Sequence, residues 1–430
     1  MPGTRTGAVA RRHPLRPTLL EVRVSPAAVV AALAVVLTAV RFEVHLSITL
    51  GTLLGVALAP VWIGSLRRFR GASLLMGLGA AALVAGVWLT EVSAADRRTS
   101  DRLLLVSVVL VLNLLVGTGV LLWARTLLPD ALVAVLYGVG MLAGISGEGR
   151  FAENPWRFGF SVPLTVLLLG LTWYLRRKWL GVAAALALGA VSALNDGRST
   201  FAMLVLTAVL VAWRAGPRPT SGRRRSTLRS MSLVLALGFA VYNLGQGLIL
   251  DGYLGESTQQ RTAAQMATSG SLILGARPEL GATSALVQAR PQGYGAGTLP
   301  SAQDVTLAKA GMADLGYDPN NGYVENYMFG SGFELHSMLG DLWAGYGLVG
   351  VALCALMAWQ VGRHFADSVG SRSLNALMTF LVIRTAWNLL FSPLNSSVTL
   401  MVLTLGLALA VYDPVRSSRR AGADVRAYSA

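Results

Sequence analysis

Apolar runs that are long enough to cross a lipid bilayer recur along most of the chain, and one long polar stretch interrupts them. A helix needs about 20 apolar residues to cross the hydrocarbon core of a bilayer. Of the 430 residues, 54% are hydrophobic and only 13% are charged, which is far from the composition of a soluble domain. The pattern predicts an all-α polytopic membrane protein: a single membrane domain over residues 1–430, with a large polar loop at residues 251–335.

We expect twelve membrane-spanning helices. Arg and Lys favour the cytoplasmic ends of such spans, and a cytoplasmic N-terminus puts more than twice as many of them inside as outside. The tails 1–25 and 413–430 are then cytoplasmic, and the loop 251–335 lies outside, between spans nine and ten. The expected spans are residues 26–40, 44–63, 72–90, 103–124, 131–146, 159–175, 180–194, 199–213, 231–250, 337–361, 373–391 and 395–412.

The charge of the chain does not indicate nucleic acid as a partner. The net charge is +15, but the basic residues lie in short clusters between apolar runs. The loop itself carries more acidic than basic residues, which argues against nucleic acid or anionic lipid as its general partner. The single cysteine, Cys354, excludes an intrachain disulfide.

Aromatic residues alternate with Gly and Asn along the loop. The flat faces of aromatic rings suit the C–H faces of sugars, and amide side chains suit sugar hydroxyls. The same rings would equally pack the loop onto the membrane domain, and both interpretations stay open. The rings are Tyr294, Tyr317, Tyr323, Tyr327, Phe329 and Phe333.

Three short motifs follow one another at the expected outer face. Arg198 lies in Asn-Asp-Gly-Arg-Ser at the start of the eighth span. Arg277 follows a Gly-Ala pair, and Arg290 opens the turn Arg-Pro-Gln-Gly-Tyr-Gly, which contains Tyr294. His336 comes just before the tenth span, which continues with spaced leucines and glycines.

In type and order these motifs resemble those of the O-antigen ligase and polymerase superfamily, polytopic membrane glycosyltransferases with a GT-C-like fold. Twelve spans with the large loop between the ninth and tenth are similar to the layout of that family. The chain departs from the family pattern at Ser337, where Asn is frequent, and at Gly345, where Glu is frequent. Asp341, one turn into the tenth span, would supply a carboxylate instead.

The resemblance implies a glycan donor linked through diphosphate to a polyprenol, and a hydroxyl acceptor on another glycan or a lipid. Forked guanidinium donors suit the charge that develops on the leaving diphosphate. Arg198 would serve there together with Arg277 or Arg290, which compete for one role. His336 would accept the proton of the acceptor hydroxyl. The sequence has no Asp-x-Asp pair and no His/Cys cluster with ligand spacing, so we expect no metal and no other cofactor.

Three further residues are possible supporting groups: Asp341, Tyr294 and Arg384. Arg384 lies well inside the eleventh span, with Asn388 one turn on. A charge inside a membrane span is a functional candidate by default. Arg384 would equally serve as a structural partner for Asp341 or Asn113.

The sequence therefore favours a glycan polymerase or ligase in the cytoplasmic (inner) membrane, acting on its outer side, with envelope-glycan assembly proteins as possible partners. A secondary transporter or flippase is the first alternative, because twelve spans are common in transporters. Transporters concentrate their sites at the bilayer midplane, however, between repeated halves, and no internal repeat is visible here. A membrane scaffold whose loop binds a partner protein is the third possibility.

Overall fold

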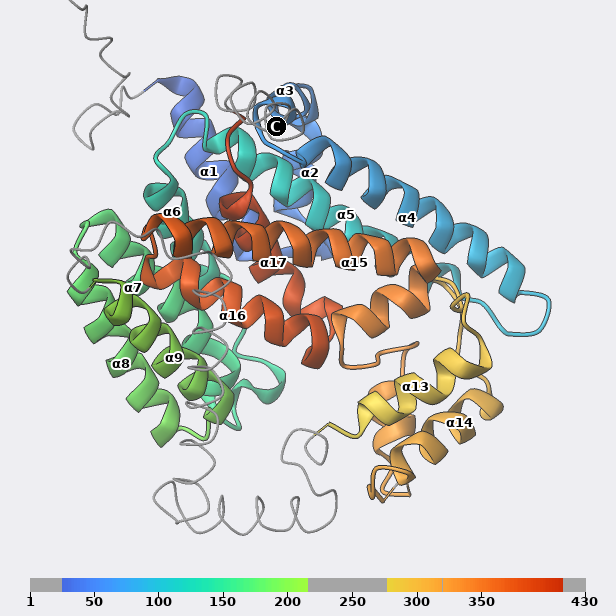
Figure 1. Ribbon diagram of the computed structural model, residues 1–430. Helices are drawn as coiled ribbons and strands as arrows, with labels where there is room; N and C mark the ends of the chain where they lie inside the picture. Colours follow the sequence, from blue (N-terminus) through green and yellow to red (C-terminus); the bar gives the residue numbers. More distant parts are fainter. Residues whose placement is uncertain (1–24, 216–276, 319, 413–430) are drawn as a thin grey trace, which may run out of the picture.

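The computed structural model describes residues 25–215, 277–318 and 320–412, which form a predominantly α-helical molecule (Figure 1). The expected ninth span, residues 231–250, and the loop residues 251–276 lie outside the described residues, as do nearly all of both tails. In the first half of the chain the helices are α1 (Pro26–Val40), α2 (Leu50–Ala57), α3 (Ala59–Ser65), α4 (Ala72–Ser93), α5 (Asp101–Ala124), α6 (Asp130–Ala143), α7 (Ser161–Tyr174), α8 (Lys178–Leu194) and α9 (Arg198–Ala215). In the second half they are α13 (Glu279–Ala289), α14 (Ala302–Ala313), α15 (Met338–Ser371), α16 (Ala376–Phe391) and α17 (Leu394–Ala408).

Every expected span that falls within the described residues contains a helix, so the predicted all-α membrane architecture is confirmed at this level. Four helical segments are long and apolar enough to cross a bilayer: α4, α5, α15 and residues Trp156–Tyr174, which combine a short π-helix with α7. A fifth crossing results if the bent pair α2–α3 is one span. The other apolar helices are shorter, with apolar stretches of 10–17 residues. The number of twelve crossings stays a prediction.

The second expected span, residues 44–63, differs from a single helix. It opens with a two-stranded antiparallel hairpin, β1 (Glu43–His45) and β2 (Ile48–Thr49). A reciprocal capping box between Thr49 and Thr52 then starts α2. Pro60, in the first turn of α3, has no N–H to continue the ladder of α2. The axis therefore bends by 72° between the two short helices.

The helix ends sort onto two opposite sides of the molecule. On one side the guanidinium of Arg41 donates to the Asn395 side chain, 3.3 Å away. On the other side the Nη1 of Arg125 donates to the carbonyls of Gly406 and Leu409, at 2.6 and 2.9 Å. The segment 277–335 lies on the first side, which we call the loop side (Figure 1).

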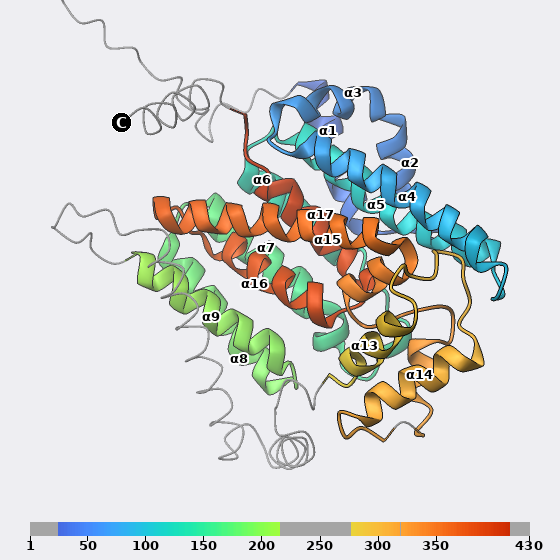
Figure 2. The same cartoon turned by 45° about the vertical axis from the view of Figure 1, so that its right-hand side comes forward.

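The loop segment 277–335 folds onto the membrane domain and has a core of its own. Its helices α13 and α14 lie side by side next to the start of α15 (Figure 2). Gly281 and Gly311 face one another where these helices cross, so a side chain on either would meet the backbone of the other. The core continues into the first turns of α15. Its buried members are Ala282, Leu286, Tyr294, Ala308, Met312, Val324, Met328, Phe329, Leu335, Trp343 and Ala344.

The tenth expected span is one long helix, α15, with a break. Gly347 has φ 60° and ψ −146°, a backbone conformation open essentially to glycine alone. The break separates a short N-terminal part, residues 338–346, from the longer part that continues to Ser371. The short part follows His336 directly and joins the loop core to the membrane domain.

Candidate functional site

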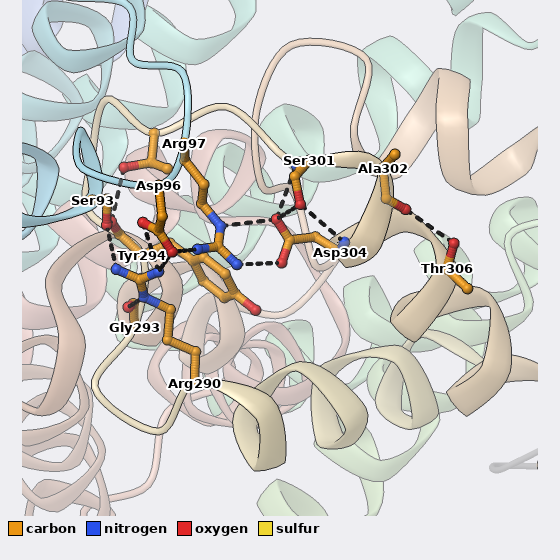
Figure 3. Close-up of polar contacts among 11 residues, drawn as sticks. Ser93, Asp96, Arg97, Arg290, Gly293, Tyr294, Ser301, Ala302, Asp304 and Thr306 are labelled. Atoms are coloured by element: carbon orange, nitrogen blue, oxygen red, sulfur yellow. Dashed lines mark hydrogen bonds and ion pairs between the residues drawn. The ribbon is translucent and has the colours of Figure 1, made fainter.

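A network of ion pairs fastens the loop segment to the connection between α4 and α5 (Figure 3). The Nε and Nη2 of Arg97 donate to the two carboxylate oxygens of Asp304, at 3.0 and 2.9 Å. The Asp304 side chain is 0% exposed and also accepts from the Ser301 backbone N–H, which opens α14. Burial would raise the pKa of Asp304, but the bonds from Arg97 and Ser301 outweigh it and hold that pKa below its usual value.

Arg290 and Tyr294, two of the sequence-predicted site residues, belong to this network. Arg290 donates through Nη1 to Asp96 at 2.8 Å, through Nη2 to Ser93 at 2.9 Å and through Nε to the carbonyl of Gly293 at 3.1 Å (Figure 3). The Tyr294 ring is 0% exposed and stacks on Phe333, with 4.1 Å between centroids. Both residues therefore anchor the loop, and neither presents its polar group to an open surface.

A second cluster of arginines lies at the loop-side half of α16. The Arg277 guanidinium lies over the rings of Trp387 and Phe391, 5.3 and 5.6 Å from their centroids. Arg384 lies one turn before Trp387 on the same helix, next to the aromatic face over which the Arg277 guanidinium lies. Positions 384, 387, 388 and 391 share one face of a helix, because their spacing follows the 3.6-residue period.

Neither arginine of this second cluster has a carboxylate partner among the described residues. The Nη1 of Arg384 approaches the sulfur of Met203 in α9 at 3.9 Å, and its buried Nε has no partner there. Asn388, 4% exposed, likewise leaves its Oδ1 without a partner in the described part of the chain. Two cations at one helix face that lack a carboxylate partner among the described residues, together with a buried amide, form a site that favours an anion.

His336 lies at the same end of α16, held in a left-handed turn with φ 54°. Its Nδ1 is 3.1 Å from the carbonyl oxygen of Glu334, so Nδ1–H donates to that carbonyl, and in the neutral imidazole the lone pair is then on Nε2. The next residue, Ser337, donates to the carbonyl of Leu389 in α16 at 3.0 Å. The histidine is thereby fixed between the loop core and the helix that carries Arg384.

Tyr323 lies between His336 and Glu279, which is two residues after Arg277 in the chain. Its ring centroid is 5.8 Å from the His336 ring, and its hydroxyl donates to Glu279 Oε1 at 2.7 Å. Burial raises the pKa of Tyr323 and the Glu279 carboxylate adds to the rise, while the positive charge of Arg277 opposes it. The structure thus brings together two residues that the motifs singled out, Arg277 and His336, from positions 59 apart in the chain.

Asp341 and Arg198 lie at the edges of this cluster. The Asp341 carboxylate accepts from the backbone N–H groups of Leu335 and Leu394, both at 2.7 Å, so it positions the turn that carries His336. Arg198 begins α9, about 7.5 Å along the helix from Met203 at 1.5 Å per residue. Because α9 and α16 run in opposite directions (Figure 2), Arg198 lies toward the end of α16 that carries Phe391. Its Nε is 3.8 Å from Asp196.

Sequence reasoning missed Glu279 and the aromatic face of α16. The spacing of Trp387 and Phe391 after Arg384 is visible in the sequence as a helical stripe. Nothing in the sequence, however, indicates that Arg277 would lie on that stripe, more than a hundred residues away. Glu279 carries no motif at all.

Within residues 25–215, 277–318 and 320–412, no group of three or more His, Cys, Asp or Glu side chains is arranged to hold a metal ion. Comparisons of the chain with protein-family models, with curated proteins and with solved structures find no match.

Proposed function

We propose that the protein is an extracytoplasmic glycan polymerase or ligase that transfers an oligosaccharide from a polyprenyl diphosphate to a hydroxyl of a glycan or lipid acceptor. The observation that carries the proposal is that Arg277 and Arg384 both lie at the aromatic face of α16, at the end of the helix next to His336, and that neither has a carboxylate partner among the described residues. A diphosphate would supply the negative counter-charge for the two guanidinium groups. The apolar helices below it suit a polyprenol chain.

In the proposed reaction the acceptor oxygen forms a bond to C1 of the donor sugar. The bond from C1 to the diphosphate oxygen breaks, and the diphosphate leaves with the electron pair. Arg277 and Arg384, with Arg198 nearby, would stabilise that charge by forked hydrogen bonds, so the arginines would take the place that a metal holds in other enzymes. His336 would take the acceptor proton on Nε2, because Nδ1 is engaged with Glu334.

The proposal includes the topology expected from the sequence. Twelve spans, both termini in the cytoplasm and the loop outside the cytoplasmic membrane would bring the arginine pair to the outer leaflet, where a lipid-linked envelope glycan is presented. Polymerase and ligase share this chemistry and differ only in the acceptor.

The test is transfer by the purified full-length protein, with lipid-linked glycan extracted from the native cells. We expect Arg277→Ala and Arg384→Ala to abolish transfer. His336→Gln should lower the rate by about 10² to 10⁴, the usual contribution of a positioned base. Arg363→Ala is the matched control, because Arg363 lies in the distal part of α15, where it contacts the Trp359 ring at 5.4 Å and pairs loosely with Asp367 at 4.0 Å. Full activity in Arg277→Lys and Arg384→Lys together would contradict forked diphosphate binding.

One observation favours a transporter or flippase instead. The axis break at Leu58 and the break of α15 at Gly347 are of the kind found where transporters bind their substrates. In vesicles that contain the protein, a flippase would move lipid-linked glycan from one leaflet of the membrane to the other without releasing polyprenyl diphosphate. Release of polyprenyl diphosphate that depends on His336 would therefore separate the two functions.

A further inference from the structure

Three tyrosines of the segment 317–327 form a cluster of rings that reaches His336. Tyr323 lies at its centre, with ring centroids 6.0 Å from Tyr317, 5.7 Å from Tyr327 and 5.8 Å from His336. Tyr327 stacks on Tyr323 with 29° between the ring planes, yet is 66% exposed. One face of the cluster is therefore open to solvent, directly beside the proposed base.

Local structure explains why Tyr327 is exposed while Tyr317 and Tyr323 pack against the loop core. The π-helix Val324–Met328 turns Val324 and Met328 into the loop core, where both are fully buried. Tyr323 and Tyr327, four residues apart, stack on one another; Tyr323 packs against the loop core, and Tyr327 is exposed. Hydrogen bonds fix the cluster, since Tyr323 donates to Glu279 and Tyr317 accepts from the Asn321 side chain at 2.8 Å. Packing of the loop accounts for Tyr294 and Phe329, which are buried, but it does not account for an exposed, stacked Tyr327.

The surroundings of the cluster are polar, and Arg277, whose guanidinium lies over the rings of Trp387 and Phe391, is the positive charge near Tyr323 that has no carboxylate partner among the described residues. Asn321 and Asn326 are exposed next to the rings. The one lysine of the segment, Lys309, is paired with Glu325. An anionic lipid surface would call for a cluster of about 4–8 Lys or Arg side chains, and one arginine does not supply it. Neutral sugar rings fit better, because their C–H faces stack on aromatic faces and their hydroxyls bond to amides.

We propose that Tyr327, Tyr323 and the amides of Asn321 and Asn326 form a binding platform for the acceptor glycan, which holds its terminal sugar next to His336. The inference rests on the proposed function and adds to it where the acceptor binds. The platform adjoins the histidine through Tyr323, whereas the two arginines meet at the aromatic face of α16: Arg384 belongs to that helix, and the Arg277 guanidinium lies over Trp387 and Phe391. The acceptor sugar and the diphosphate of the donor would thus approach the reacting hydroxyl from two sides.

The test measures two quantities on the purified full-length protein. The first is binding of the delipidated glycan, released by mild acid from the lipid-linked glycan of the native cells. The second is the KM for that glycan as acceptor, separately from kcat. We expect Tyr327→Ala to weaken binding and raise the KM about 2- to 10-fold, the range of one aromatic stacking contact, with kcat unchanged. Tyr327→Trp should keep or improve binding.

Two further variants separate stacking from other roles. Tyr327→Leu keeps an apolar side chain but no flat face, so it should behave like Tyr327→Ala. If leucine restores binding, the ring is only an apolar or membrane contact and the platform is refuted.

Tyr412→Ala is the matched control, because Tyr412 is 49% exposed but contacts Arg70 on the opposite side. An equal effect of Tyr412→Ala, or an unchanged KM in Tyr327→Ala, overturns the inference. If the wild type binds the glycan through Tyr327 but transfers nothing, the proposed function fails and the platform stands.

Discussion

Arg384 shows how a single residue can serve a site at a cost to the fold. Its Nε is buried without a partner among the described residues, and the positive charge of Arg277 lies nearby. A buried charge without a counter-charge destabilises the folded state. Proteins keep such groups mainly where function needs them, so stability and activity should respond to its removal in opposite directions.

Replacement of Arg384 by methionine is therefore expected to stabilise the protein while it abolishes transfer. Relief of the unsatisfied group should raise the free energy of unfolding by about 1–3 kcal/mol. Arg125→Met is the matched control, because Arg125 is equally enclosed but bonds to Asp130 and to two carbonyls. Arg125→Met should lower the free energy of unfolding by about 3–5 kcal/mol. Thermal denaturation in detergent measures both, and a comparable loss of stability in Arg384→Met would contradict the interpretation.

Asp304 should make attachment of the loop sensitive to acid. Its pKa is lowered in the folded protein relative to the ordinary value of 3.8, so its ionised form contributes stability that is fully present above 3.8. That contribution is lost as the pH falls below 3.8 through the folded value. The denaturation midpoint should therefore drop between about pH 5 and about pH 2. At neutral pH, Asp304→Asn should lower the free energy of unfolding by about 3–5 kcal/mol. The same acid sensitivity in Asp304→Asn as in the wild type would show that other carboxylates are responsible.

The residues of the site were predictable from the sequence only in part. Arg277 and His336 stand in motifs, and the structure brings them together at one end of α16. Arg290 and Tyr294 stand in the same motif turn, yet they anchor the loop, because Arg290 meets Asp96, 194 positions earlier in the chain. An ion pair over such a separation leaves no local pattern in a single sequence, whereas a charge inside an apolar run, such as Arg384, does.

At the scale of elements, the break in α15 is expected to set the position of the site. A Cβ at residue 347 would lie 2.5 Å from the Gln292 carbonyl and 2.9 Å from the Leu89 side chain, in a backbone conformation that alanine avoids. Gly347→Ala should therefore cost about 1–3 kcal/mol and lower transfer, since the short part of α15 follows His336. Gly362→Ala, in the same helix with nothing within 4 Å, should stabilise by about 0.5–1 kcal/mol. Denaturation and transfer assays measure both, and a harmless Gly347→Ala would mean that the break carries no structural constraint.

Several helices lie where the apolar runs of the sequence predicted them. The run at 72–90 became α4, Ala72–Ser93, and the run at 103–124 became α5, Asp101–Ala124. The prediction ended the tenth span at residue 361, but α15 continues ten residues further. The added turns are polar on one side, while Phe365 and Val369 pack against Leu210 of α9. The packing against Leu210 is a tertiary contact, and a hydropathy pattern does not predict tertiary contacts.

For the whole molecule, the alternation of helix ends agrees with a chain that crosses a layer back and forth. Hydrogen bonds join Arg41 to Asn395 on the loop side and Arg70 to Ala410 on the opposite side. The distribution of Arg and Lys then predicts which side is cytoplasmic. The proposed function requires the loop side to face outward, because donor glycans of the envelope are presented there.

Cysteine labelling in intact cells is the test of this orientation. The only native cysteine, Cys354, is buried, and Cys354→Ala provides a background without thiols. Gln303→Cys on α14 and Ser371→Cys at the far end of α15 change exposed residues on opposite sides. A membrane-impermeant maleimide should modify residue 303 in intact cells and residue 371 only after permeabilisation. The reverse pattern would put Arg277, Arg384 and His336 on the cytoplasmic side. Transfer outside the membrane would then be impossible, whatever the chemistry of the site.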